Sequence, residues 1–182
     1  MKPLQVGPQT FAWGARTYLM GILNITPDSF SGDGLLSHAE GVDAALEQAH
    51  RFLSAGADIL DVGGESTRPG SQTVTAAAEL GRVIPVIAAL TREFPAAVIS
   101  IDTYKAVVAE QAIQAGARIV NDVCGFRADP QLAAVTARAG VPAILMHNRS
   151  KPANAQVLEN LGGRYVGMEY GNLLEDVKRE LL

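Results

Sequence analysis

The stretch AGADILDVGGE, residues 55–65, contains a pattern that the chain uses three times. An Ala-Gly pair precedes a short apolar run and then polar residues, as it also does in AGARIVNDVCG (115–125) and AGVPAILMHN (139–148). Glycine directly after a helix is a common terminator, and an apolar run of this length is typical of a strand buried on both faces. The pattern predicts a repeated unit of helix end, turn, buried strand and functional loop.

Apolar runs of the same kind define the expected strands. We expect a short hairpin around residues 4–14 and then five strands, at 17–24, 57–63, 98–102, 118–123 and 141–147. Helical patterns separate these strands, and strands that alternate with helices indicate a parallel α/β sheet.

The helices carry their own start and stop signals. Ser37 and Glu40 fit a capping box before a helix that ends at Gly56. Pro85 lies inside the apolar stripe of the second helix and should kink it or start a new segment. Asp129 and Pro130 fit the cap and first position of the fourth helix. The third, fourth and last helices are expected at about 104–115, before Gly140, and at about 172–182.

The positions of the polar residues decide between two parallel architectures. A doubly wound sheet usually has a glycine-rich phosphate turn, and neither GxGxxG nor GxxxxGK[ST] occurs here. A (β/α)8 TIM barrel places its chemistry at the carboxyl ends of many strands. Polar residues end the apolar runs at Asn24, Asp61, Asp102, Asn121, Asp122 and His147. We therefore predict a single barrel domain over residues 1–182.

Five βα units make this an incomplete barrel, because a full one takes about 250 residues. The first and fifth strands would have unpaired edges, which are prone to aggregation. Either the chain is a fragment, or it assembles with another chain.

Composition excludes several classes of protein. Hydrophobic residues make up 48% of the 182, which indicates a sizeable core. A net charge of -4 without a basic cluster argues against nucleic-acid binding. The apolar runs are too short to cross a membrane, and the N-terminus has no signal-peptide core. The single cysteine, Cys124, fits a reducing cytoplasm.

Two polar regions are candidates for ligand binding. Asp102, Asn121 and Asp122 close neighbouring strands, where a carboxylate beside an amide can bind the edge of a heterocycle. The alternative is that they satisfy backbone groups, but several at one face favour function. In DVGGESTRPGS (61–71), Thr67 and Arg68 make a polar loop that suits a phosphate or carboxylate. An ordinary βα loop is the alternative, and Glu65 either orients Arg68 or is solvated.

The three histidines, His38, His50 and His147, form no recognisable ligand pair, which argues against zinc. Mg2+ needs only one or two protein oxygens besides substrate phosphates. The side-chain carbonyl of Asn24 can supply one.

LNITPDSFSGDG (23–34), DVGGESTRPGS, IDTYKAVVAEQAIQAGARIVNDV (101–123) and ILMH (144–147) together resemble dihydropteroate synthase, the pterin-binding family of folate biosynthesis. The resemblance implies a TIM barrel that condenses 6-hydroxymethyl-7,8-dihydropterin pyrophosphate with p-aminobenzoate and releases pyrophosphate. It implies that Asn24 holds Mg2+ and that Asp102, Asn121 and Thr67 contact the pterin substrate. Arg68 belongs to the same loop as Thr67. Phe30 and Pro69 would wall the p-aminobenzoate pocket, where sulfonamides compete.

The resemblance covers the N-terminal two-thirds of the family. Its later motifs, an Asp-Pro-Gly, a Ser-Arg-Lys and an Arg-x-His pair, do not occur in the 182 residues. We therefore expect these residues alone to have little or no activity. The family is commonly dimeric, which implies a homodimer for a complete chain.

Two alternatives remain open. One is a pterin-binding domain of a corrinoid methyltransferase, which shares the Asp-x-Gly-Gly feature but needs no pyrophosphate loop. The other is a non-catalytic, truncated pterin-binding paralogue.

Overall fold

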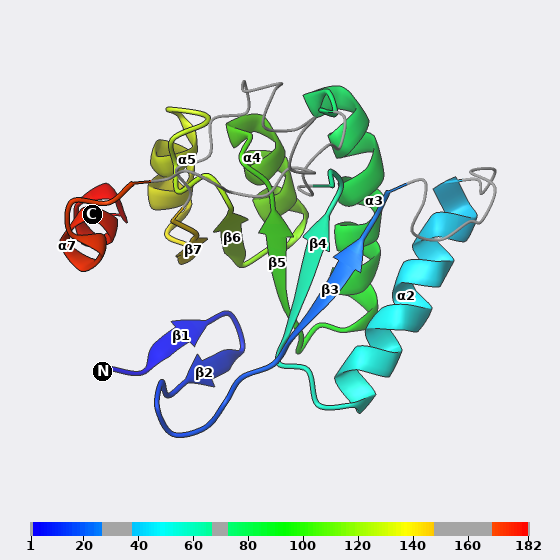
Figure 1. The fold of residues 1–182 in the computed structure, drawn as a ribbon. Helices are drawn as coiled ribbons and strands as arrows, with labels where there is room; N and C mark the ends of the chain where they lie inside the picture. Colours follow the sequence, from blue (N-terminus) through cyan, green and yellow to red (C-terminus); the bar gives the residue numbers. More distant parts are fainter. Residues whose placement is uncertain (1, 27–37, 67–72, 148–168, 182) are drawn as a thin grey trace.

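The computed structural model describes residues 2–26, 38–66, 73–147 and 169–181. Five parallel strands form one sheet in the order of the chain. They are β3 (Met20–Asn24), β4 (Ile59–Gly63), β5 (Val98–Asp102), β6 (Ile119–Asp122) and β7 (Ala143–Leu145). The five predicted strands are confirmed; β5 has the predicted bounds, and the other four are shorter than expected. The sheet is an open arc, so the prediction of an incomplete barrel is also confirmed (Figure 1).

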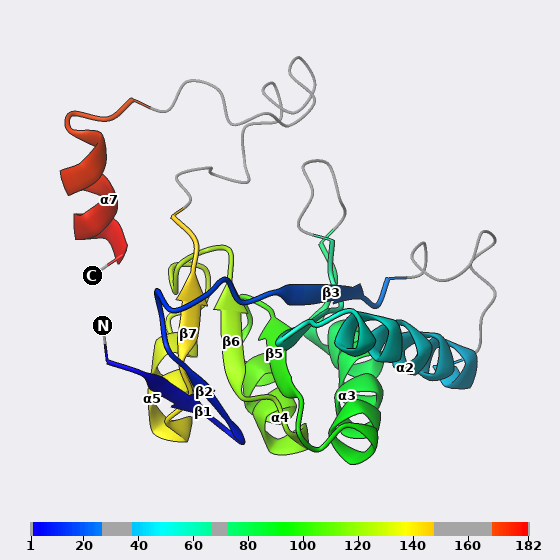
Figure 2. The same cartoon turned by 90° about the horizontal axis from the view of Figure 1, so that it is seen from below.

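Four helices cover the outer face of this arc (Figure 2). They are α2 (His38–Ser54), α3 (Ala76–Glu93), α4 (Ala106–Ala115) and α5 (Leu132–Ala139). The strand residues that face them are apolar and buried, among them Leu60, Ile101 and Val120. Burial of each such side chain contributes about 1.5–3 kcal/mol. The core therefore lies between sheet and helices, and the inner face of the sheet is left for other contacts.

An N-terminal hairpin packs against the amino ends of the strands. β1 (Leu4–Val6) pairs antiparallel with β2 (Gln9–Phe11), as predicted. Val6 and Phe11 are buried against the strand residues Ile59, Val98 and Ile119, at or near the beginnings of β4, β5 and β6. The hairpin therefore covers the amino ends of the strands and leaves their carboxyl ends accessible.

An ion pair holds the segment between this hairpin and β3 in place. The carboxylate of Asp58 accepts hydrogen bonds from Arg16 Nη1, at 3.0 Å, and from the backbone N–H of Leu19, at 2.8 Å. The hydrogen bond from Arg16 is the main reason that the pKa of Asp58 is lowered. These contacts fix where β3 begins relative to β4.

Pro85 starts no new segment, because α3 runs without interruption from Ala76 to Glu93. Pro85 removes the hydrogen bond that the carbonyl of Gly81 would otherwise accept. Both residues are exposed, so water can solvate that carbonyl. The helix tolerates this proline because its opposite face is buried.

The prediction that Asp129 caps α5 is wrong. α5 begins at Leu132, and its N-cap residue Gln131 makes no side-chain cap. Asp129 instead accepts a hydrogen bond from the backbone N–H of Ala106 at 2.8 Å, and its other oxygen accepts one from Gln131 at 2.9 Å. Asp129 thus caps α4, whose own N-cap residue Lys105 makes no side-chain cap.

Gly116, which ends α4, offers a test of the packing between the helices. A Cβ at this position would lie 2.2 Å from Thr91 Oγ1, and its φ is +121°. Gly116→Ala should therefore lower the free energy of unfolding by about 2–4 kcal/mol. Gly140→Ala is the matched control, because Gly140 has φ +66° and open space around it. Urea unfolding of both variants measures the difference, and equal losses would contradict the predicted clash.

No helix in the described parts of the chain is long and apolar enough to cross a membrane.

Candidate functional site

Three of the predicted site residues form a row across the carboxyl edge of the sheet. In the strand register, Asn24 pairs with Gly63, Gly63 with Asp102, and Asp102 with Asn121. Residues in register on parallel strands present their side chains to the same face. We call Asn24, Gly63, Asp102 and Asn121 the polar row. It confirms the expectation that these strand-end residues come together.

Gly63 leaves an opening in the polar row. A Cβ at this position would lie 3.5 Å from Asp102 Oδ2 and 3.8 Å from Asn24 Oδ1. Because glycine has no side chain, the oxygens of Asn24 and Asp102 both border unfilled space. A ligand can therefore approach the backbone between them.

Asp102 has the properties of a binding residue rather than a structural one. Its Oδ1 atom is buried and has no hydrogen-bond partner among the described residues. Burial raises the pKa of Asp102 to about 7, with further contributions from nearby carboxylates, Asp61 first among them. A carboxyl group with an unused buried oxygen and a perturbed pKa is a candidate for ligand contact.

Asp61 and Ser100 lie one row deeper on the same inner face. Asp61 is in the middle of β4, because the strand continues past the apolar run to Gly63, as predicted. Its Oδ2 accepts a hydrogen bond from Asn121 Nδ2 at 3.0 Å. The other oxygen of Asp61 and the hydroxyl of Ser100 are buried and have no partner within the described ranges.

Asp122 belongs to the structural framework, so the functional interpretation of this residue is wrong. It follows Asn121 directly, and successive strand residues point to opposite faces. Its two carboxylate oxygens accept hydrogen bonds from the backbone N–H groups of Cys124, at 2.7 Å, and Phe126, at 2.6 Å. Phe126 has φ 62°, and these bonds help to hold the loop in that conformation.

His147 lies beyond the end of β7, where it contacts the last helix. Its Nε2 atom is 2.8 Å from Oε2 of Glu180 in α7 (Leu173–Leu181). No group of three or more His, Cys, Asp or Glu residues in the described ranges is arranged to hold a metal ion.

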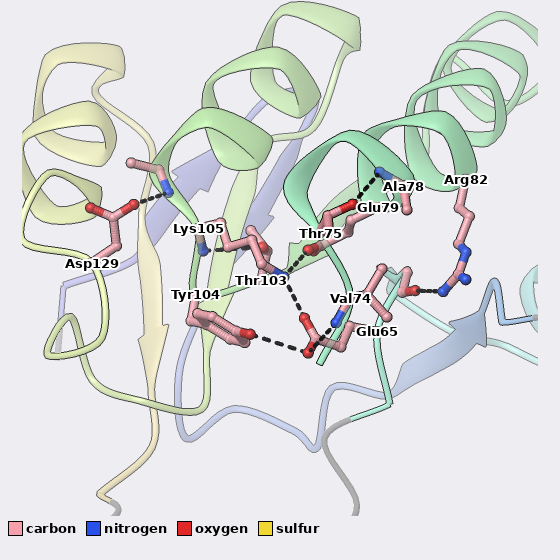
Figure 3. A network of polar contacts seen from close by, with 12 residues as sticks. Glu65, Val74, Thr75, Ala78, Glu79, Arg82, Thr103, Tyr104, Lys105 and Asp129 are labelled. Carbon is pink, nitrogen blue, oxygen red and sulfur yellow. Dashed lines mark hydrogen bonds and ion pairs between the residues drawn. The ribbon is translucent and has the colours of Figure 1, made fainter. Parts of the chain in front are cut away.

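Glu65, Glu79, Tyr104 and Lys105 form a charged cluster (Figure 3), and its two glutamates are near enough to Asp102 to affect that residue's pKa. We call it the Lys105 cluster. Lys105 Nζ is paired with Glu65 and lies 2.5 Å from Glu79 Oε2. Glu65 Oε1 also accepts hydrogen bonds from Tyr104 Oη and from the N–H of Val74, each at 3.1 Å. Glu65 is therefore not solvated, which removes one of its two sequence-based interpretations.

The charge of Lys105 is maintained by its partners. Burial alone would lower the pKa of Lys105, but the hydrogen bonds to Glu65 and Glu79 raise it above its usual value. Sequence reasoning did not identify Lys105 or Glu79. The signal available was a lysine three residues after Asp102, in the loop that leaves β5.

Four predicted site residues, Phe30, Thr67, Arg68 and Pro69, lie outside the described residues. So does Ser37 of the predicted capping box. Their roles stay predictions.

Comparison with known proteins identifies the relatives of this chain. Dihydropteroate synthase of Clostridium beijerinckii is 46% identical over 178 residues, which cover 98% of this chain and 59% of that protein. A crystal structure of dihydropteroate synthase from Clostridium difficile in the presence of pteroic acid has a TM-score of 0.79 and 42% identity, and the match covers 94% of this chain and 58% of that chain. The structure of Xanthomonas albilineans dihydropteroate synthase with 4-aminobenzoic acid has a TM-score of 0.72 and 38% identity, covering 92% and 54%.

The chain thus spans 54–59% of the length of these three relatives. The family model described as pterin binding enzyme matches residues 20–180. The matched segment contains all five strands of the sheet and the whole polar row. The chain belongs to the family of pterin-binding enzymes.

Proposed function

We propose that this chain carries the pterin site of a dihydropteroate synthase. The reaction joins 6-hydroxymethyl-7,8-dihydropterin pyrophosphate to p-aminobenzoate. The observation that carries the proposal is the polar row, in which the buried Oδ1 of Asp102 has no hydrogen-bond partner among the described residues. A pterin ring edge presents N–H donors, and a carboxylate with a free lone pair is their natural acceptor. Relatives crystallised with pteroic acid and with 4-aminobenzoic acid support both halves of the reaction.

The chain's own residues bind and orient in this proposal, and none acts as a nucleophile. Asp102 and Asn121 bind the pterin edge. The C–O bond between the pterin methylene and the pyrophosphate breaks, the amine nitrogen of p-aminobenzoate bonds to that methylene, and the amine then loses a proton. Thr67 contacts the pterin substrate, and Arg68 in the same loop suits its phosphate groups. Phe30 and Pro69 form an apolar wall for p-aminobenzoate and exclude water that would compete with the amine.

The donor set at the end of β3 fits Mg2+. Asn24 contributes an amide oxygen, which borders the opening left by Gly63. One or two protein oxygens are enough for a Mg2+ ion that also binds phosphates. Bound there, the ion would offset the charge that develops on the leaving pyrophosphate.

Titration calorimetry of the 182-residue chain with 6-hydroxymethylpterin tests the proposal. We expect a saturable heat of binding for the pterin, and little or no p-aminobenzoate-dependent release of pyrophosphate, because the chain spans 59% of the length of the Clostridium beijerinckii synthase. Binding of methyl-tetrahydrofolate but not of 6-hydroxymethylpterin would instead favour the corrinoid methyltransferase alternative. Sedimentation of a longer chain that includes the later motifs of the family tests the homodimer that the resemblance implies for a complete chain.

A further inference from the structure

The side-chain amide of Asn121 is held by Asp61, which lies one row deeper on the inner face of the sheet than the polar row. Asn121 Nδ2 donates to Asp61 Oδ2 at 3.0 Å. The bond runs from β6 to β4 and passes over β5, where Ser100 pairs in register with Asp61. Asp61 is only 3% exposed, so this bond is shielded from water.

This hydrogen bond determines which end of the Asn121 amide faces the ligand. An ionised carboxylate only accepts hydrogen bonds, so the NH2 group of Asn121 must be turned toward Asp61. Burial raises the pKa of Asp61, while the side chains of Ser100 and Asn121, by hydrogen bonding, favour the ionised form. The carbonyl oxygen Oδ1 of Asn121 is therefore the end of the amide left for a ligand.

Asp102 is the neighbour of Asn121 in the polar row, and it also offers acceptors. The two residues pair in register on β5 and β6. Asp102 Oδ1 has no partner among the described residues. Two adjacent acceptors select a ring edge with two adjacent donors, such as the 2-amino group and ring N–H of a pterin. An edge with acceptors would face repulsion.

A stabilising role alone does not explain Asp61. Its Oδ1 and the hydroxyl of Ser100 are buried without a well-formed hydrogen bond in the described parts of the chain, although Ser100 lies close enough to favour the ionised form of Asp61. Each such atom costs about 1–3 kcal/mol. An apolar residue at position 61 would avoid the cost of the carboxylate. The polar floor beneath the row is thus retained at the expense of stability, as is common at binding sites.

We propose that Asp61 is a positioning residue that orients the amide of Asn121, and that it thereby makes the site selective for the donor edge of a pterin. This inference rests on the proposed function, since it takes a pterin as the ligand. It adds a residue that does not itself have to touch the ligand.

The test compares the affinity of the chain for pterin and for lumazine, in which a carbonyl acceptor replaces the 2-amino donor. The wild-type chain should prefer pterin. Asp61→Asn allows the amides at positions 61 and 121 to face each other either way round. The ratio of the two affinities should then fall about tenfold, the size expected for one misdirected hydrogen bond. Ser100→Ala is the matched control, because it changes a residue at the same depth as Asp61 and leaves the hydrogen bond between Asn121 and Asp61 in place. The ratio of its two affinities should stay as in the wild type.

The reciprocal variant Asp61→Asn with Asn121→Asp provides the rescue. An amide at 61 would donate to a carboxylate at 121, and that carboxylate would present an acceptor to the ligand. The pterin preference should return. A folded swap variant without this preference, or a folded Asp61→Asn variant with an unchanged ratio, would overturn the proposal. The swap decides the matter if Asp61→Asn alone does not fold.

A second readout separates this proposal from the proposed function. In a 15N-edited NMR spectrum of the ligand-free chain, the side-chain NH2 protons of Asn121 should exchange slowly with water, and exchange should become faster in Asp61→Asn but not in Ser100→Ala. If the wild type binds neither pterin nor lumazine but shows these spectra, the proposed function fails while the orientation of Asn121 stands. Fast exchange in the wild type would refute the positioning role directly.

Discussion

Replacing Lys105 with methionine is expected to lower the free energy of unfolding by about 3–5 kcal/mol, the usual cost of removing one partner from a buried ion pair. The side chain of Glu79 is 1% exposed and that of Glu65 is 8% exposed. Without Lys105, two carboxylates would face each other in a site with little water. Methionine preserves most of the volume, so the loss reports on charge rather than on a cavity.

Urea unfolding at neutral pH measures this loss, and two observations check its cause. Lys105→Arg keeps the charge and should lose much less. In Lys105→Met, the two unpaired carboxylates repel each other as long as both are charged. Uptake of a proton at low pH relieves this repulsion, which returns as pH rises, so the deficit should shrink toward pH 4. A deficit that does not change with pH would indicate lost packing instead.

Replacing Asp102 with alanine is expected to weaken the binding of 6-hydroxymethylpterin by on the order of 10- to 100-fold. A hydrogen bond to a charged group contributes about 1.5–3 kcal/mol, and the alanine leaves the pterin donors without their acceptor. Calorimetry at pH 8, where the carboxyl group is mostly ionised, gives the clearest comparison. Unchanged affinity in a folded Asp102→Ala variant would show that the pterin assignment of this residue is wrong.

The carboxyl group of Asp102 should also make the free energy of unfolding depend on pH. Its ionisation favours pterin binding but lowers the stability of the fold. The pKa of Asp102 is about 7 in the folded chain, against about 3.9 in an unfolded one. Between these values the folded chain holds a proton that the unfolded chain has lost, so the free energy of unfolding falls as pH rises from about 4 to 7. Asp102→Asn cannot lose this proton. It should be more stable than the wild type at pH 8, by on the order of 1–2 kcal/mol, and similar to it near pH 4.

The fold was predictable because it repeats. Each strand is an apolar run followed by polar residues, and each helix has an apolar stripe of its own. Parallel strands also bring their carboxyl ends to one edge, so the meeting of Asn24, Asp102 and Asn121 followed from topology alone.

The roles of two aspartates were not predictable, because they depend on register. Asn121 and Asp122 are adjacent, and only the pairing with β5 shows that the asparagine faces inward and the aspartate outward. A shift of one residue would exchange them. Asp61 lies two residues before the end of β4, and only the register of β4 with β3 and β5 reveals that it lies beneath the polar row.

The Lys105 cluster could not be predicted from the sequence for a different reason. Lys105 and Glu79 are 26 residues apart, and Lys105 and Glu65 are 40 apart. Each of these charges, taken alone, is typical of a solvated surface. Only the packing of α3 beside α4 buries them together, and no local pattern predicts that.

The order of the strands has a consequence for how the chain folds during synthesis. Each strand of the sheet pairs with the one made just before it, so pairing can advance unit by unit as the chain leaves the ribosome. The hairpin is the exception. Val6 and Phe11 are made before all five strands of the sheet, yet the side chains that bury them include Val98 of β5 and Ile119 of β6. The hairpin therefore emerges before the sheet but is fully buried only after β6 has formed, and a nascent chain that stalls before β6 leaves these apolar side chains open to chaperones.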